Sequence, residues 1–61
     1  MKFAVKIRYL ESRYTGDGKW HQKTTNWYDD SDDAWSESDK FLCKNSNTIV
    51  ESSCGIMHKE R

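Results

Sequence analysis

The sequence predicts one small α+β domain over residues 1–61: an antiparallel three-stranded sheet, in the chain order β-β-α-β, with one helix packed on one face. Three observations predict this fold. Residues 2–9 alternate between apolar and polar side chains, as a half-buried strand does. The Asp-Gly step at 17–18 indicates a hairpin. Residues 34–42 carry apolar and small side chains at helical spacing.

The first strand is expected at residues 2–9. Its apolar positions are Phe3, Val5, Ile7 and Tyr9. Because successive side chains of a strand point to opposite faces, these four would face the core and the basic residues between them would face outward.

The second strand is expected from about Trp20 to Tyr28, after a type I′ turn centred on Asp17 and Gly18. Such a turn would set Ile7 opposite Tyr28. The outer face of the hairpin would then carry Lys6, Arg8, Lys23, Thr25 and Trp27. A bulge or a different register stays open, because the residues expected to face inward are only moderately apolar.

The helix is expected to begin after Asp30 or Ser31, either of which can cap it, and to end near Asn45. The acidic residues that follow the cap suit the positive end of the helix dipole. Trp35 lies on the apolar stripe of this helix and is expected in the core.

The third strand is expected at residues 48–53, with an interruption near Gly55. Ile56 and Met57 would either continue the strand past a bulge or pack back on the core. Residues 58–61 are expected to be a frayed tail.

Length and composition restrict the function. A chain of 61 residues buries only about 60% of the surface that its unfolded form exposes, which leaves no room for a deep cavity. With 34% hydrophobic residues the core is expected to be small, and self-association is one way for a protein with a small core to gain stability. Open edge strands make a homodimer compatible with the predicted sheet.

The sequence favours a cytoplasmic location. Its longest apolar stretches are too short for a membrane span or a signal peptide. Cys43 and Cys54 are too few for a disulfide framework, so we expect reduced thiols. Whether the two cysteines are buried, free or paired stays open at this point.

Enzyme signatures are missing from the sequence, and we expect neither catalysis nor a cofactor. No glycine-rich phosphate loop occurs. Cys54 and His58 stand four residues apart, but a thiol that packs in the core and a tail histidine account for them. His21 and Cys43 lack the close pairing of zinc ligands, and the acidic run lacks the EF-hand glycine and glutamate, so no metal is expected.

Charge is distributed unevenly along a chain whose net charge is zero. Residues 1–25 hold six basic and two acidic side chains, whereas residues 26–45 hold six acidic and two basic ones. Interleaved cations and aromatics are typical of protein interfaces and of surfaces that bind single strands, although an ordinary solvated face also fits. The predicted partner-binding residues are Lys6, Arg8, Lys23, Trp27, Trp20, Asp32 and Asp33. Whether the basic strand face or the acidic helix start makes the contact stays open.

Three segments resemble small phage-encoded proteins that disarm host defences, such as anti-CRISPR and antitoxin-like proteins. They are the basic strand at residues 1–7, the step into the helix at 28–35 and the closing strand at 47–51. The likeness covers most of the chain and rests on size and element order, so no family's site residues are carried over. The resemblance implies a non-catalytic viral inhibitor that binds and blocks a host defence protein, such as a CRISPR nuclease complex or a toxin, in the host cytoplasm. The alternative is a small nucleic-acid-binding module that uses the basic and aromatic sheet face.

Overall fold

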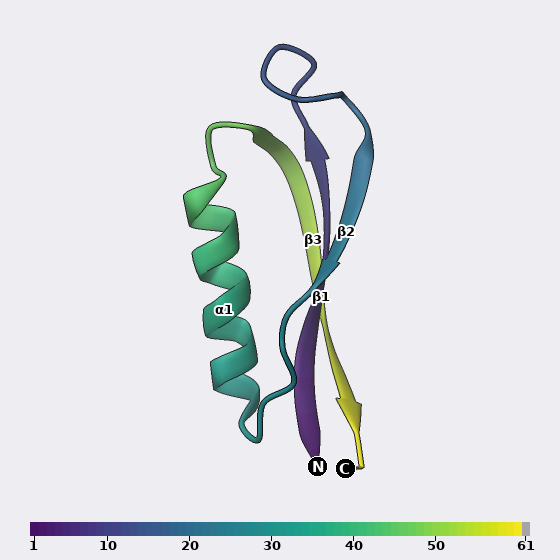
Figure 1. Ribbon diagram of the computed structural model, residues 1–61, viewed down its shortest axis with the longest axis vertical. Helices are drawn as coiled ribbons and strands as arrows, with labels where there is room; N and C mark the ends of the chain where they lie inside the picture. The colour runs from purple at the N-terminus through teal and green to yellow at the C-terminus, as the bar shows by residue number, and fades with distance from the viewer. Residues whose placement is uncertain (61) are drawn as a thin grey trace.

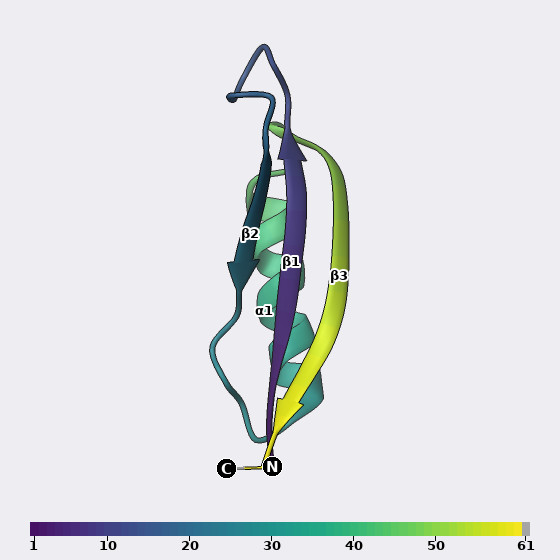
Figure 2. The same cartoon turned by 90° about the vertical axis from the view of Figure 1, so that its right-hand side faces the viewer.

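The computed structural model describes residues 1–60 and has two layers, a sheet and a helix (Figure 1). Three antiparallel strands form the sheet in the order β2-β1-β3: β1 (Lys2–Glu11), β2 (Trp20–Thr24) and β3 (Ile49–Lys59). Helix α1 (Ser31–Lys44) covers one face, and Figure 2 shows the face that it leaves uncovered. The predicted fold class is confirmed. The molecule is elongated, 40 × 17 × 13 Å, because the loop between β1 and β2 projects past the end of the helix.

Strand β1 lies in the middle of the sheet, and its predicted alternation is confirmed. Val5 and Ile7 are fully buried and form the core with Ala34 of the helix. Ala4 is also fully buried although it points to the uncovered face. The core is small, and partly buried side chains surround it: Phe3, Tyr9, Tyr28, Phe41, Leu42 and Cys54.

The register of the hairpin differs from the prediction. Ile7 lies opposite Lys23, where the predicted turn had set it opposite Tyr28, a shift of five residues. An odd shift moves every side chain of the second strand to the other face. Asp17 and Gly18 do not form a two-residue turn; they belong to a longer loop, in which Asp17 Oδ1 accepts a hydrogen bond from the Lys19 amide at 3.0 Å.

β2 ends at Thr24, but the residues that follow it remain hydrogen-bonded to β1. The Thr25 amide donates to the Val5 carbonyl at 3.0 Å, and Thr25 is buried rather than on the outer face. Pairing with β1 resumes at Tyr28, the predicted end of the second strand: Tyr28 exchanges both backbone hydrogen bonds with Phe3, each at 2.7 Å. Tyr28 therefore lies beside Phe3 and not beside Ile7.

The predicted bounds of the helix are confirmed. Asp30 is its N-cap and accepts a hydrogen bond from the Asp32 amide at 2.9 Å, and Asn45 is its C-cap. The prediction for Trp35 is wrong, because its exposed fraction is 36%. Ala34 and Ser38 are the helix residues that are buried against the sheet. Only short side chains at these positions let the helix lie close to β1.

Strand β3 is longer and more regular than predicted. It runs through Gly55 without interruption, and it includes His58 and Lys59, which were expected in a tail. The only shift in its pairing with β1 falls at the far end, between Leu10 and Glu11. Arg61, the last residue of the predicted tail, lies outside the described residues. Within residues 1–60 no helix has the length and apolar character needed to cross a membrane.

Candidate partner-binding face

The uncovered face of the sheet is turned toward the viewer in Figure 2. Every second residue of each strand contributes its side chain to this face. In β1 these are the even-numbered positions, because the odd ones pack on the helix. Directly opposite residues of antiparallel strands share a face, so the register adds Met57, Gly55 and Ser53 from β3 and Trp20 from β2.

Arg8 and Trp20 form an exposed pair on this face. The Arg8 Cζ atom lies 5.9 Å from the ring centroid of Trp20, within the range of a cation–π interaction. Trp20 keeps an exposed fraction of 49%. Trp20, one of the predicted partner-binding residues, is therefore exposed to solvent.

A second aromatic and cationic pair lies at the opposite end of the face. The Lys59 Nζ atom is 4.5 Å from the ring centroid of Trp27, whose exposed fraction is 38%. Trp27 is therefore partly exposed, as predicted, although it follows β2 rather than belonging to it. Nearby, Lys2 Nζ lies 2.5 Å from Asp29 Oδ1, and this hydrogen bond lowers the pKa of the Asp29 carboxyl.

Between the two pairs the face is hollowed. A shallow depression of about 250 Å³ is lined by Lys6 and Arg8 of β1 and by residues 53–57 of β3. Gly55 leaves this space because it has no side chain, and a Cβ atom there would meet nothing within 4 Å. A protruding side chain or a flat ring can therefore approach the sheet backbone at this point.

The basic strand residues and the acidic helix start lie on different layers. The uncovered face carries Lys6, Arg8 and Lys59. Asp32 and Asp33, which were also predicted to bind a partner, lie in the first turn of α1 on the other side of the sheet. The structure therefore does not bring the basic strand residues and the acidic helix start together into one surface.

Lys23 does not belong to the basic face, contrary to the prediction. The register places it opposite Ile7, on the helix side, and its Nζ atom lies 5.4 Å from the ring centroid of Phe41. His21 likewise lies on the helix side and stacks on Tyr9, with 5.4 Å between the ring centroids. The observed register allows both ring contacts.

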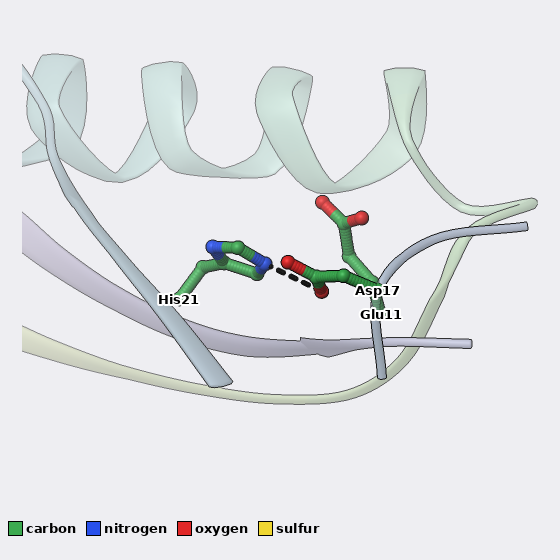
Figure 3. A group of neighbouring side chains, drawn as sticks. All are labelled: Glu11, Asp17 and His21. Carbon is green, nitrogen blue, oxygen red and sulfur yellow. Dashed lines mark hydrogen bonds and ion pairs between the residues drawn. The ribbon is translucent and has the colours of Figure 1, made fainter. Parts of the chain in front are cut away.

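Glu11, Asp17 and His21 gather where β1, the hairpin loop and β2 meet (Figure 3). Their potential ligand atoms all lie within 4.8 Å of one another. The imidazole Nε2 of His21 and Asp17 Oδ1 are 2.9 Å apart, and this hydrogen bond is the main cause of the lowered pKa of Asp17. Two carboxylates and an imidazole suit a divalent transition metal, but three ligands are fewer than the four of a closed structural zinc site.

Cys54 and His58 are not placed to act together. Both belong to β3, four residues apart, and a strand rises about 3.3 Å per residue, so about 13 Å separates their backbones. Burial raises the pKa of the Cys54 thiol, which favours the unreactive protonated form. Both cysteines are free, with Cys43 exposed on the helix and Cys54 half-buried.

Sequence reasoning missed two features of these sites. Lys59 was assigned to a frayed tail, and only its pairing with Lys2 places it on the uncovered face. The cluster of Glu11, Asp17 and His21 depends on the hairpin loop, and the spacing of Asp17 and His21 was its only sequence signal. Comparison of the chain with protein-family models, with curated proteins and with solved structures finds no match.

Proposed function

We propose that this protein is a non-catalytic binding protein whose uncovered sheet face docks on an acidic surface of another protein and blocks it. The observation that carries the proposal is the Arg8–Trp20 pair, an exposed aromatic and a guanidinium in contact on a face that no element of residues 1–60 covers. A few residues carry most of the binding energy of a protein interface, and tryptophan and arginine are enriched among them. In agreement with the resemblance to phage-encoded inhibitors, the proposed partner is a host defence protein such as a nuclease complex or a toxin.

Charge supports a protein partner. The basic groups of the face would attract an acidic surface, and the acidic groups of α1 point away from it. The net charge of zero gives little of the non-specific attraction by which proteins bind phosphate backbones.

The experiment is affinity capture from nuclease-treated bacterial lysate, followed by direct binding measurements on the captured protein. Trp20→Ala and Arg8→Glu should each weaken binding at least tenfold. The controls are Trp35→Ala and Lys40→Glu, which change a partly exposed tryptophan and a cation on the helix layer. Equal binding by the parent and both face variants would refute the proposal.

A second candidate function is single-strand nucleic-acid binding. Trp20 and Trp27 lie at the two ends of one face with cations between them, an arrangement on which separate bases can stack. Titration with a short oligothymidylate at low salt, followed by tryptophan fluorescence, decides it. Quenching that weakens with added salt and disappears in Trp20→Ala supports this function, and unchanged fluorescence excludes it.

A further inference from the structure

The outer edge of β3 is the longest unpaired strand edge within residues 1–60. β3 has eleven residues, whereas β2, the strand at the other edge, has five. Natural proteins blunt exposed edges with proline, bulges or charged side chains. Between Glu51 and Lys59 this strand contains no proline, lysine, arginine or acidic residue. Its central part is therefore open to pairing with another strand.

The backbone pattern shows which groups of β3 point outward. The amide and carbonyl of Phe3 are both hydrogen-bonded to Tyr28. The backbone groups of the odd residues of β1 therefore point toward β2, and those of the even residues point toward β3. The β3 partners of the even residues, such as Met57 and Gly55, bond back to β1. The amide and carbonyl groups of the even residues of β3, from Ser52 to His58, therefore point off the edge.

We propose that two copies of this chain pair antiparallel along β3, with the twofold axis at Gly55, and join their sheets into one. In this register Glu51 lies directly opposite Lys59 of the second copy, and the twofold axis repeats the pair at the other end. Both residues point to the uncovered face, as a direct cross-strand ion pair requires.

The helix side of the same register is also complementary. Cys54 lies opposite Ile56 of the second copy, and the axis again repeats the pair. Ile56 has an exposed fraction of 44% in the single chain, and Cys54 is half-buried. The four side chains would form one apolar cluster across the junction, flanked on the other face by the two ion pairs.

Self-complementarity favours a second copy over an unrelated strand. A twofold axis at Gly55 needs opposite charges at equal distances from it, and Glu51 and Lys59 each stand four residues away. If the axis lay at Cys54, Glu51 would face Met57 and the charges would be unmatched. The small core of Val5, Ile7 and Ala34 also leaves the single chain in need of further burial. The uncovered faces of both copies lie on the same side of the joined sheet.

Sedimentation velocity over a concentration series tests the dimer and its register. The parent is expected to pass from monomer to dimer, and Ile56→Lys, which puts a charge on the edge, should abolish the dimer. Glu51→Lys and Lys59→Glu should each raise the dissociation constant about tenfold, because each creates two like-charge pairs. The double variant Glu51→Lys with Lys59→Glu should restore the parent value. Gln22→Lys, on β2, is the matched control and should leave dimerisation unchanged.

A cross-link gives an independent reading of the same register. With Cys43 and Cys54 changed to serine, Gly55→Cys would face its own copy in a non-hydrogen-bonded pair, with about 4.5 Å between the α-carbons, a separation that a disulfide spans. Mild oxidation should give a covalent dimer, whereas Ser53→Cys in the same background should not. A parent chain that stays monomeric at millimolar concentration, a dimer that survives Ile56→Lys, or a double variant that does not recover would each overturn the proposal.

Discussion

The hydroxyl of Thr25 accepts a hydrogen bond from the backbone amide of Val5 at 2.8 Å, while the Thr25 amide donates to the Val5 carbonyl at 3.0 Å. Both residues are buried. At this point β2 has ended, and a side chain takes the place of the missing strand carbonyl. Thr25 thus completes the hydrogen bonding of the central strand while the chain turns toward the helix.

Replacing Thr25 with valine should therefore destabilise the protein by about 1–3 kcal/mol, because the buried Val5 amide would lose its acceptor while the side-chain shape is kept. Thr25→Ser keeps the hydroxyl and should cost less. Urea unfolding followed by tryptophan fluorescence measures both variants. Equal losses of stability in Thr25→Val and Thr25→Ser would show that the hydrogen bond is not what stabilises this position.

Ser38 should tolerate a smaller side chain and reject a larger one. Its exposed fraction is 1%, and its hydroxyl donates to the Trp35 carbonyl of its own helix at 2.8 Å. Ser38→Ala removes this hydrogen bond, which is additional to the backbone hydrogen bonds of the helix, and should change stability by less than about 1 kcal/mol. Ser38→Leu should cost about 1–3 kcal/mol, because it separates the helix from β1. Thermal unfolding by circular dichroism compares the two variants.

Two glycines should respond oppositely to alanine. Gly18 has a φ of +68°, and a Cβ atom there would lie 2.9 Å from Arg13 Cγ. Gly18→Ala should cost roughly 1–2 kcal/mol. Gly55 has no positive φ and has open space at its Cβ, so Gly55→Ala is the matched control and should be neutral or stabilise by up to about 1 kcal/mol. Denaturant unfolding at concentrations where the chain is monomeric checks both values, and equal costs would contradict the loop conformation.

Alkaline pH should destabilise the fold through Tyr28. Its hydroxyl donates a hydrogen bond to the Glu37 carboxylate, and this bond raises the pKa of Tyr28 above its ordinary value of 10.0. The folded state then holds the phenol proton more tightly than the unfolded state. The stabilisation is therefore present below pH 10 and is lost as the pH rises through the folded pKa.

Absorbance titration of the phenolate band tests this expectation. The difference between the titration curves of the parent and of Tyr28→Phe should show one tyrosine that ionises above pH 10. Glu37→Gln removes the charge but keeps an acceptor. In this background, the pKa of Tyr28, obtained from the difference between Glu37→Gln and the double variant Glu37→Gln with Tyr28→Phe, should move toward its ordinary value. A Tyr28 titration that Glu37→Gln leaves unchanged would show that the carboxylate is not the cause.

Local signals in the sequence were sufficient to predict the fold class, the alternation of β1 and both ends of the helix. Each depends on neighbouring residues: Asp30 caps the amide two positions ahead, and Val5 and Ile7 are buried because a strand turns its side chains at every residue. The predicted exposure of Arg8 followed from the same alternation.

Only the tertiary structure determined which residues share a face with Arg8. The sequence placed a tight turn at Asp17 and Gly18, but a longer loop lets His21 stack on Tyr9 and sets Trp20 beside Arg8. The observed register differs from the predicted one by an odd number of residues, and side chains of a strand alternate between faces at every residue. Lys23 therefore lies on the helix side, and Thr25 is hydrogen-bonded to the buried Val5 amide. The pairing of distant segments has no local signal in the sequence, since it is decided by the sum of contacts that form only when the sheet and helix come together.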